Sequence, residues 1–438
     1  MTASLPATRH QGSPCRVAVV GLGYVGLPTA LALHAAGMTV LGIDRDERRI
    51  AAIARGEADL VASDRRLLAS AAGDERFVLT TDAGRLPEAD VVMVCVPTPV
   101  DAHLAPELGA LRQACETLVR QARPGQTLIL TSTSFVGTAR QLLVEPLETR
   151  GFTVGKDLFV AASPERIDPG RVTHTQRETP RVLGGVTPAC TRRAQEVLGL
   201  VSGSAHVVGS PEAAEMTKLF ENSFRAVNIA LANEFADVCT SLSLDPMEIV
   251  TAAATKPYGF MAFQPGPGVG GHCIPCDPHY LLWQLRASRG SAPIVAQAMQ
   301  AIADRPRQVA DRVLDVLSRT GKGIAGTRVV VVGVTYKPGV RDVRSSSALD
   351  VIGLLAARGA KVDYHDPLVP SVELPNGSTV DSVVGPLGGD WDLALIHTVQ
   401  PGHDYGWLEQ CPIVVDATYR FLPADAAPRA EDGPSCVA

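Results

Sequence analysis

Residues 16–26, RVAVVGLGYVG, join a short apolar segment to a glycine-rich turn, and this stretch decides the fold. The segment Arg16–Val20 is rich in β-favouring residues and predicts a strand. Residues 27–37 are rich in alanine and leucine and end at a glycine, which is typical of a helix and its stop signal. Thr39–Ile43 predicts a second strand, and Asp44 follows it at once. The order of strand, glycine turn, helix, strand and acid predicts a dinucleotide-binding βαβ unit.

The three glycines have different roles in such a unit. Gly21 permits the tight turn, Gly23 leaves room for a pyrophosphate at the helix N-terminus, and Gly26 lets helix and strand pack closely. Asp44 can accept hydrogen bonds from both ribose hydroxyls and would repel a 2′-phosphate, which favours NAD over NADP, although Arg45 beside it weakens that preference. The alternative is a glycine turn that binds nothing. The complete context of the turn favours the NAD site.

Strand and helix signals divide the rest of the chain into three parts. Alternating strands and helices follow the first unit and predict a parallel sheet covered on both faces, with strands at 77–80, 91–96, 127–130 and 158–161. Residues 212–244 contain neither proline nor glycine and predict one or two long helices. After a Gly/Pro-dense loop, a second helical region ends near residue 319. A second βαβ pattern opens at 328–333, with strands at 362–364, 393–397 and 413–416.

The expected fold is therefore α/β, with two Rossmann-like, doubly wound parallel-sheet domains joined by a central helical domain that contains a long helix. We expect the NAD-binding domain at 1–210, the helical domain at 211–322 and the second Rossmann-like domain at 323–438. In the second domain the turn after the first strand has one glycine where the fingerprint has three, so we expect no second NAD there.

Composition argues against several classes of protein. The 438 residues are 46% hydrophobic and 20% charged, which is typical of a globular chain. A net charge of -6 without a long Lys/Arg run argues against a nucleic-acid binder. The apolar runs are far shorter than the ~20 residues that span a membrane, and residues 1–14 lack the apolar core of a signal peptide. Nine scattered cysteines form no disulfide framework. We expect a cytoplasmic protein.

Residues 266–279, GPGVGGHCIPCDPH, contain four glycines within six residues, which indicates backbone approaches that a side chain would block. Three chemistries are open for Cys273. It is a nucleophile on a rigid turn, a zinc ligand together with His272, Cys276 and His279, or a redox partner of Cys276. Adjacent histidine and cysteine side chains rarely converge on one ion, and a proline in a glycine-rich loop is not the setting of a thioredoxin-type pair. The nucleophile is favoured.

A polar stripe of Glu215, Lys218, Asn222 and Arg225 lies within the otherwise apolar helical segment. A solvated helix face is the simplest interpretation of such a stripe. However, Lys218 and Asn222 are one helical turn apart, and a cation and an amide donor in that arrangement are what an alkoxide or tetrahedral oxyanion needs.

Several motifs occur in one order along the chain. They are GLGYVG at 21–26, CVPTP at 95–99, ST at 132–133, SPE at 163–165, KLFEN at 218–222, GGHCIP at 270–275 and YKP at 336–338 with Arg344. Together they resemble the UDP-glucose/GDP-mannose dehydrogenase family of nucleotide-sugar 6-dehydrogenases, over about residues 16–421. The resemblance implies a four-electron oxidation at C6 of a UDP-sugar to the uronic acid, two NAD used in turn, and a homodimer built through the central helix. No metal is expected.

The resemblance also implies roles for individual residues. Cys273 would add to the C6 aldehyde and pass from thiohemiacetal to thioester, while Lys218, Asn222 and an ordered water take the first proton. Glu165 and Thr133 would lie near a hydrolytic water, with Glu165 favoured as the base, and Asp277 would organise the site. The expected NAD contacts are Gly21, Gly23, Tyr24, Val25, Gly26, Asp44, Arg45, Thr98, Ser132, Thr133 and Arg344. The expected substrate contacts are Glu165, Arg166, Lys218, Asn222, Arg225, Tyr258, Phe260, Gly270, Tyr336 and Lys337.

Departures from the family pattern bear on the substrate. Val136 stands where the family usually has proline, so this loop is expected to sit differently. Arg166 follows Glu165 where UDP-glucose enzymes tend to have Phe-Leu, and Cys276 replaces a lysine of those enzymes. These features, with TKPYGF at 255–260, favour UDP-GlcNAc or another UDP-N-acetylhexosamine, with UDP-glucose as the alternative. Two other classes remain open, a catalytically silent nucleotide-sugar-binding regulator and a two-electron 3-hydroxyacid-type dehydrogenase.

Overall fold

The protein is seen in a computed structural model that describes residues 15–58, 60–166, 177–383 and 389–421. The expectation about residues 1–14 therefore lies outside the described residues. The chain divides into two compact units, the first made of 1–221 and 279–289 and the second of 222–278 and 290–438.

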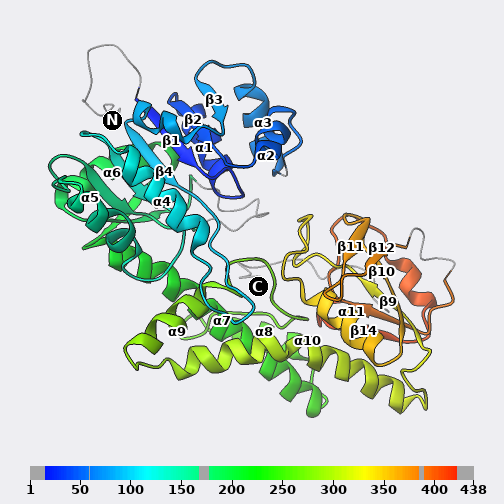
Figure 1. The fold of residues 1–438 in the computed structure, drawn as a ribbon. Helices are drawn as coiled ribbons and strands as arrows, with labels where there is room; N and C mark the ends of the chain where they lie inside the picture. The colour runs from blue at the N-terminus through cyan, green and yellow to red at the C-terminus, as the bar shows by residue number, and fades with distance from the viewer. Residues whose placement is uncertain (1–14, 59, 167–176, 384–388, 422–438) are drawn as a thin grey trace. The chain divides into compact units, whose positions relative to one another are not determined.

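The first unit is built on one eight-stranded sheet in the order β3-β2-β1-β4-β5-β6-β7-β8 (Figure 1). The strands are β1 Arg16–Val20, β2 Thr39–Ile43, β3 Phe77–Thr80, β4 Val91–Val94, β5 Thr127–Leu130, β6 Phe159–Ala162, β7 Arg181–Gly185 and β8 Ala205–Val208. The first six run parallel, in the strand order of dinucleotide-binding domains. The predicted doubly wound sheet is confirmed, with one difference. Strand β7 runs antiparallel to β6, a pairing that needs no crossover helix.

Helices cover both faces of this sheet, which is why β4, β5 and β6 are buried along their whole length. Alternate strand residues point to two separate cores, one shared with α4 and the other with α1, α3 and α6. The helical segments of this unit are α1 Gly26–Ala35, α2 Glu47–Ala54, α3 Ala62–Ala71, η1 Ala83–Glu88, α4 Gly109–Gln121, η2 Arg140–Val144, α5 Glu145–Thr149, α6 Pro188–Val201 and α9 Asp277–Ala287.

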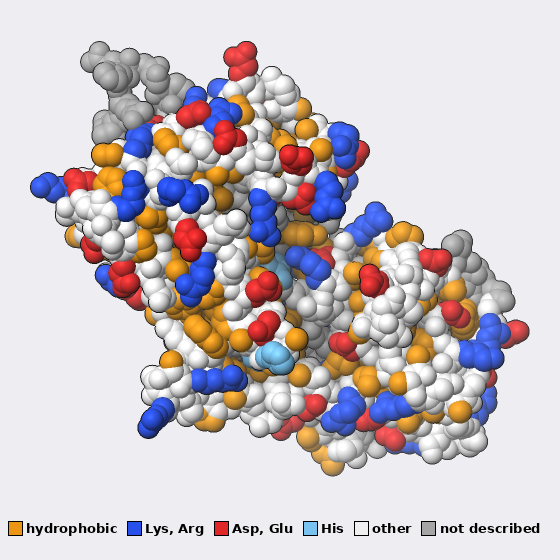
Figure 2. Space-filling view, in the orientation of Figure 1, with side chains coloured by type: hydrophobic (Ala, Val, Ile, Leu, Met, Phe, Trp, Pro, Cys, Tyr) orange, Lys and Arg blue, Asp and Glu red, His pale blue; other side chains and the backbone are white. Residues whose placement is uncertain are grey.

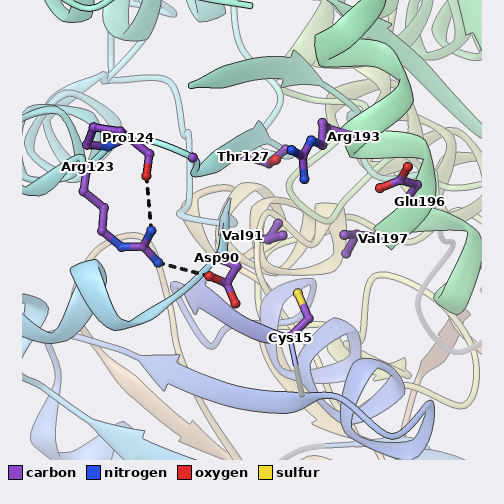
Figure 3. A pocket seen from close by; sticks show the side chains of 10 residues that line it. Cys15, Asp90, Val91, Arg123, Pro124, Thr127, Arg193, Glu196 and Val197 are labelled. Carbon is purple, nitrogen blue, oxygen red and sulfur yellow. Dashed lines mark hydrogen bonds and ion pairs between the residues drawn. The ribbon is translucent and has the colours of Figure 1, made fainter. Parts of the chain in front are cut away.

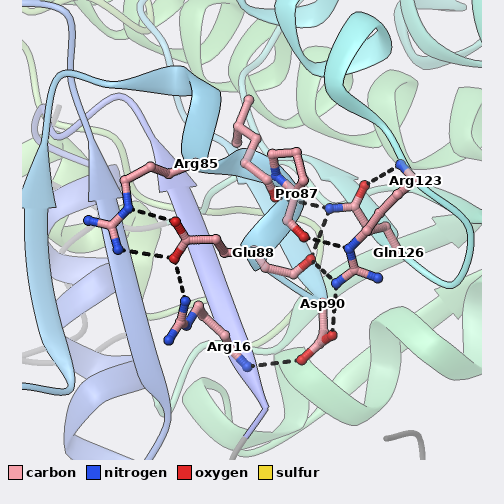
Figure 4. Close-up of polar contacts among 9 residues, drawn as sticks. Arg16, Arg85, Pro87, Glu88, Asp90, Arg123 and Gln126 are labelled. Carbon is pink, nitrogen blue, oxygen red and sulfur yellow. Dashed lines mark hydrogen bonds and ion pairs between the residues drawn. The ribbon is translucent and has the colours of Figure 1, made fainter.

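Polar side chains close the sheet at the amino ends of its strands (Figure 4). Asp90 accepts hydrogen bonds from the backbone N–H of Arg16 at 3.2 Å and from Nη2 of Arg123 at 3.1 Å. Gln126 donates to the carbonyls of Leu86 and Ala89 at 3.0 and 2.9 Å. These contacts satisfy buried backbone groups at this edge. The opposite edge, at the carboxyl ends, is left for ligands.

The second unit contains a four-stranded parallel sheet in the order β10-β9-β13-β14, as the second βαβ pattern predicts. Its strands are β9 Arg328–Val332, β10 Lys361–His365, β13 Leu393–Ile396 and β14 Val414–Asp416. A small antiparallel hairpin that the sequence did not predict joins β11 Ser371–Glu373 to β12 Thr379–Asp381. The helices α8 Pro246–Ala254, α10 Pro293–Arg319 and α11 Ser347–Ala357 and the short turn η4 Gly406–Gln410 complete this part of the fold.

The long helix α7, Pro211–Ser241, is one continuous helix of 31 residues that begins in the first unit and ends in the second. Of the described helices, none combines the length and the apolar character that crossing a bilayer requires. On the face drawn in Figure 2, Lys and Arg side chains are interspersed with Asp and Glu side chains, and no broad patch of one sign is seen there.

Candidate active site

Predicted cofactor residues of the first unit, and the predicted catalytic residue Glu165, lie at the carboxyl edge of its sheet. Asp44 follows β2, Thr98 belongs to the segment after β4, Ser132 follows β5 and Glu165 follows β6. The strand order reverses between β1 and β4, and in open α/β sheets ligands bind outside the carboxyl ends of strands at such a point. Topology thus places residues from four separate segments at one ligand-binding edge.

The glycine turn after β1 has the geometry that a dinucleotide requires. Gly21 has φ +88°, and its N–H donates to the carbonyl of Ile43 at 2.8 Å. A Cβ at Gly26 would lie 1.8 Å from the Gly21 carbonyl oxygen, so only glycine allows α1 to pack against the turn. A Cβ at Gly23 would meet no described atom within 4 Å. The predicted division of roles among the three glycines fits these positions.

Asp44 is held at the end of β2 with room to bind a ribose. Its Oδ2 accepts the backbone N–H of Leu22 at 2.8 Å and its Oδ1 accepts that of Asp46 at 3.0 Å. A carboxylate has about four acceptor positions, so half of them remain for ribose hydroxyls. Arg45 is exposed, and its Nη1 donates to Gln113 at 3.3 Å. These residues fit an NAD site.

The second unit repeats this turn and closes it. Gly333 has φ +82°, its N–H donates to His365 at 2.8 Å, and the N–H of Val334 donates to Asp366 at 2.8 Å, as Leu22 does to Asp44. However, Asp366 is only 2% exposed, and Gln400 Nε2 donates to its Oδ2 at 3.2 Å. The acid that would bind a ribose is therefore covered. This geometry supports the prediction that the second copy holds no NAD.

Glu165, the predicted hydrolytic base, forms a buried ion pair that the sequence did not indicate. Arg181, at the start of β7, donates from Nη2 to Glu165 Oε2, and the two residues are 2% and 8% exposed. The backbone N–H of Arg166 donates to Glu165 Oε1 at 2.9 Å, and the Arg166 guanidinium pairs with Glu221 of α7 at 2.6 Å. Arg181 was missed because a single arginine that opens an apolar strand is a weak sequence signal.

The polar stripe of α7 is buried, so the solvated-face interpretation is wrong. Glu215, Lys218 and Asn222 are 3%, 9% and 7% exposed. The exposed face of the same helix is instead apolar, and includes Phe220 at 63% and Phe235 at 56%. A buried lysine or glutamate is uncommon unless it is paired or has a function. The burial of these side chains therefore supports a functional role for them. Arg225 is half-buried.

The glycine-rich loop of the second unit makes the close backbone approaches that its composition predicts. A Cβ at Gly268 would lie 2.4 Å from Ser347, and one at Gly270 would lie 2.5 Å from the Cβ of Tyr336. The N–H of Gly271, which has φ +77°, donates to the carbonyl of Arg344 at 2.9 Å. The predicted substrate residues Gly270 and Tyr336 are thus brought together.

Two polar side chains hold the start of this loop. The N–H of Gly266 donates to Asn233 of α7 at 2.8 Å, and its carbonyl accepts from Arg305 Nε at 3.0 Å. Arg305 is 2% exposed, and it also donates to Asp237 at 2.8 Å and to the hydroxyl of Tyr419 at 3.0 Å. One buried guanidinium therefore joins α7, the loop and the segment after β14. The sequence did not indicate Arg305.

Cys273 is half-buried in a turn that leads into α9. Its carbonyl accepts the N–H of Asp277 at 2.8 Å, and Asp277 Oδ2 accepts Nδ2 of Asn222 at 2.5 Å. Asp277 and Asn222 are 4% and 7% exposed. Three of the predicted catalytic residues are therefore linked within the second unit. Lys218 belongs to the first unit, and its meeting with Cys273 stays a prediction.

The alternatives for Cys273 gain nothing from the geometry. Among the described residues, no three His, Cys, Asp or Glu side chains lie together as metal ligands do. Cys273 and Cys276 are not joined in a disulfide, and Cys276 is buried. His272 is exposed, with Nε2 3.8 Å from the Cys273 sulfur. The remaining predicted substrate residues, Tyr258 and Phe260, are 73% and 44% exposed on the loop after α8.

A cavity of about 120 Å³ lies at the amino edge of the first sheet, away from the glycine turn (Figure 3). Arg123, Arg193, Asp90 and Glu196 line it, so positive and negative charges are balanced there. Burial raises the pKa of the Cys15 thiol in this cavity to about 11, which keeps the thiol protonated at neutral pH. The cavity is not the dinucleotide site.

The fold and the glycine turn are those of an NAD-dependent dehydrogenase. The second Rossmann-like sheet differs from the first because the acid that would bind a ribose, Asp366, is covered. Comparison with known families identifies three consecutive domains of the UDP-glucose/GDP-mannose dehydrogenase family, the NAD binding domain at 15–199, the central domain at 212–302 and the UDP binding domain at 330–418. The chain belongs to this family and is an NAD-dependent nucleotide-sugar dehydrogenase. Membership argues against the 3-hydroxyacid-type alternative.

Relatives in the family agree in fold and in much of the sequence. The chain is 34% identical over 351 residues to UDP-N-acetyl-D-mannosamine dehydrogenase of Escherichia coli K12, covering 78% of this chain and 82% of that one. It is 32% identical over 389 residues to UDP-N-acetyl-D-glucosamine 6-dehydrogenase of Pseudomonas aeruginosa, covering 87% and 90%. The solved structure of UDP-D-ManNAc dehydrogenase from Pyrococcus horikoshii superposes with a TM-score of 0.83 at 28% identity, covering 92% and 95%.

Proposed function

We propose that this chain oxidises the C6 hydroxymethyl group of a UDP-N-acetylhexosamine to a carboxylate through a covalent intermediate on Cys273. The observation that carries the proposal is the link from Asn222 through Asp277 to the Cys273 turn, at 2.5 and 2.8 Å. Two relatives are named for UDP-N-acetylmannosamine and UDP-N-acetylglucosamine, which supports the N-acetylhexosamine class. Tyr258, Phe260, Tyr336 and Lys337 are proposed as further substrate contacts.

In the first step the alcohol becomes an aldehyde. The C6 hydroxyl loses its proton to an ordered water held by Lys218 and Asn222, and C6 loses a hydride. NAD, bound at the Gly21–Gly26 turn with Thr98, Ser132 and Thr133, supplies the hydride acceptor, and a second NAD does so in the second step. A buried ammonium next to the developing alkoxide stabilises its negative charge more strongly than water does.

In the second step the aldehyde becomes a carboxylate. The Cys273 thiolate adds to C6, and the thiohemiacetal is alcohol-like again, so it can lose a second hydride and leave a thioester. Water then attacks the thioester carbon, its proton passes to a carboxylate, and the thiol leaves. Glu165 is proposed as that base. The net change consumes one alcohol, two NAD and one water.

A stoichiometric assay tests this proposal. The purified protein is incubated with NAD and one of UDP-GlcNAc, UDP-ManNAc, UDP-GalNAc, UDP-glucose or GDP-mannose, while NADH is followed by absorbance. We expect two NADH per UDP-N-acetylhexosamine and no net oxidation by Cys273→Ser. Cys411→Ser, at another half-buried thiol, is the matched control. If Cys273→Ser turns over as fast as wild type, the covalent step is contradicted. If UDP-glucose is the best substrate, the proposed substrate class is contradicted. If no sugar yields NADH, a catalytically silent binding protein is favoured.

We further propose that the protein is a homodimer that forms through α7. The exposed face of this helix carries a row of large apolar side chains at spacings of three, four and seven residues, Phe220, Phe224, Leu231, Phe235 and Val238, and Leu242 lies just after the helix ends. Such a row is the pattern of a helix that packs against another helix. A second copy of the same helix, related by two-fold symmetry, would bury it.

Sedimentation and light scattering test the dimer. Phe235→Glu is expected to give a monomer, because a carboxylate cannot be buried unpaired in an apolar interface. The matched control is Glu234→Ala, next to it and also exposed. A dimer that survives Phe235→Glu contradicts this interface. None of the eight described cysteines is in a disulfide, which supports a reducing compartment, and we propose the cytoplasm.

A further inference from the structure

The segment 131–139 that follows β5, here called the β5 loop, carries Ser132 and Thr133 and is held from two sides. On one side is Gln284 of α9, which is 148 residues away in sequence. The N–H of Val136 donates to Gln284 Oε1 at 3.0 Å, and Gln284 Nε2 donates to the carbonyl of Val136 at 2.7 Å. The amide of Gln284 thus satisfies both backbone groups of one residue, as a neighbouring β-strand would.

On the other side the β5 loop is held by α7. Glu215, which is 3% exposed, accepts the N–H of Gly137 at 2.6 Å and the N–H of Ala139 at 2.8 Å. The ring of Phe135, buried in the loop, lies 5.7 Å from the ring of Trp283, the neighbour of Gln284 on α9. Two helices therefore fix three consecutive residues of the loop.

The contact between Val136 and Gln284 depends on a residue other than proline at position 136. A proline has no N–H to donate, and it restricts its own backbone covalently by fixing φ near -65°. The N–H of Val136 is used in a hydrogen bond of 3.0 Å to Gln284. Two side-chain hydrogen bonds with Gln284 therefore restrain the loop at this residue.

We propose that Gln284 is a positioning residue for the cofactor, which acts through Val136 to hold Ser132 and Thr133 in place for NAD. The inference rests on the proposed roles of Ser132 and Thr133. Ser132 is already fixed at its own end, because its Oγ donates to the carbonyl of Val96 at 2.8 Å. The clamp at Val136 fixes the other end, so the short stretch between them keeps one conformation, and NAD binding does not have to order it.

The test uses Gln284→Met, Val136→Pro and the double variant in the full-length protein. Gln284→Met keeps the length of the side chain and removes both hydrogen bonds, and Val136→Pro removes the donor that Gln284 meets. Val136→Ala keeps the N–H and the carbonyl and is the control for the proline variant. Ser288→Ala, directly after the end of α9, is the control for Gln284→Met, since its hydroxyl donates to the carbonyl of Leu285 at 3.1 Å.

The readouts are the Kd of NAD in the absence of sugar, and the KM of NAD and of the UDP-sugar during turnover. We expect Gln284→Met to raise the Kd and KM of NAD about tenfold, with the KM of the UDP-sugar and the Kd of NAD in both controls within about twofold of wild type. Because Gln284 and Val136 share one contact, the Kd of NAD in the double variant is expected to be no higher than the higher of the two single-variant values.

Two results would overturn the inference. One is an unchanged Kd of NAD in Gln284→Met, even if its Tm falls, because Gln284 would then be merely structural. The other is a double variant in which the two losses multiply. If Val136→Pro does not fold, the inference is tested by comparing the Kd of NAD in Gln284→Met with that in the two controls, Val136→Ala and Ser288→Ala. A different result would contradict the proposed function: a wild-type protein that binds NAD but releases no NADH with any UDP-sugar.

Discussion

Two glycines of the same turn are expected to respond in opposite ways to the same added methyl group. At Gly26 the new Cβ would lie 1.8 Å from the carbonyl oxygen of Gly21 and 3.1 Å from the Cβ of Cys95. Backbone must therefore move, and overpacking of this kind costs about 1–3 kcal/mol or more. In a unit of this size that free energy corresponds to a fall in Tm of roughly 2–12 °C. Gly26→Ala is expected to destabilise the protein before any ligand is added.

At Gly23 the new Cβ would meet no described atom within 4 Å, so the Tm of the apoprotein is expected to change little. The methyl group would instead occupy the space through which the pyrophosphate approaches the helix N-terminus. A hydrogen bond to a charged group is worth about 1.5–3 kcal/mol. Each bond lost would therefore raise the Kd of NAD about 10–100-fold.

The assay is thermal unfolding of both apoproteins, followed by titration of each with NAD. The two glycines are three residues apart, and the same change is made at both, so each variant is the control for the other. A Gly23→Ala protein that loses as much stability as Gly26→Ala would refute the assignment of roles. So would a Gly23→Ala protein that binds NAD as tightly as wild type.

Three further predictions concern buried charged side chains. Burial raises the pKa of Glu215 to about 7. Its protonated form therefore stabilises the fold fully below pH ~4.5, and this stabilisation is lost as the pH rises through ~7. Glu215→Gln should remove this pH dependence of Tm, and a Tm difference from wild type that is constant between pH 4 and 8 would contradict the prediction. Arg181→Met should cost about 3–5 kcal/mol by leaving Glu165 unpaired, and less in the double variant with Glu165→Gln, as Tm measurements would show. Arg305 holds the glycine-rich loop against α7, so Arg305→Lys should lower kcat about tenfold and change the rate at which Cys273 is alkylated, while the Kd of NAD stays unchanged. If neither kcat nor the alkylation rate changes, Arg305 has no role in holding the loop.

Local patterns in the chain predict much of this protein. A strand, a glycine turn, a helix, a strand and an acid occur within about thirty consecutive residues, and each of them is specified by neighbours in sequence. Periodicity predicts one or two long helices over 212–244, and the structure has one at Pro211–Ser241. The crowding of glycines at 266–271 predicts close backbone approaches, and tertiary structure shows that Tyr336 makes one of them. The glycine turn and the position of Asp44 at the end of the second strand were therefore predictable from sequence.

Contacts between distant segments decided the rest. Periodicity indicates that α7 has two faces, but only packing shows that the polar stripe with Glu215 and Lys218 is the buried face and that Phe220 is exposed. Three features left no signal in sequence: the reversed direction of β7, the ion pair of Arg181 with Glu165, and the contacts of Arg305 with α7 and the glycine-rich loop. Propensity and spacing act over a few residues, whereas the burial of a charge is favourable only when the fold delivers its partner. Which charges this protein buries was therefore settled by tertiary structure alone.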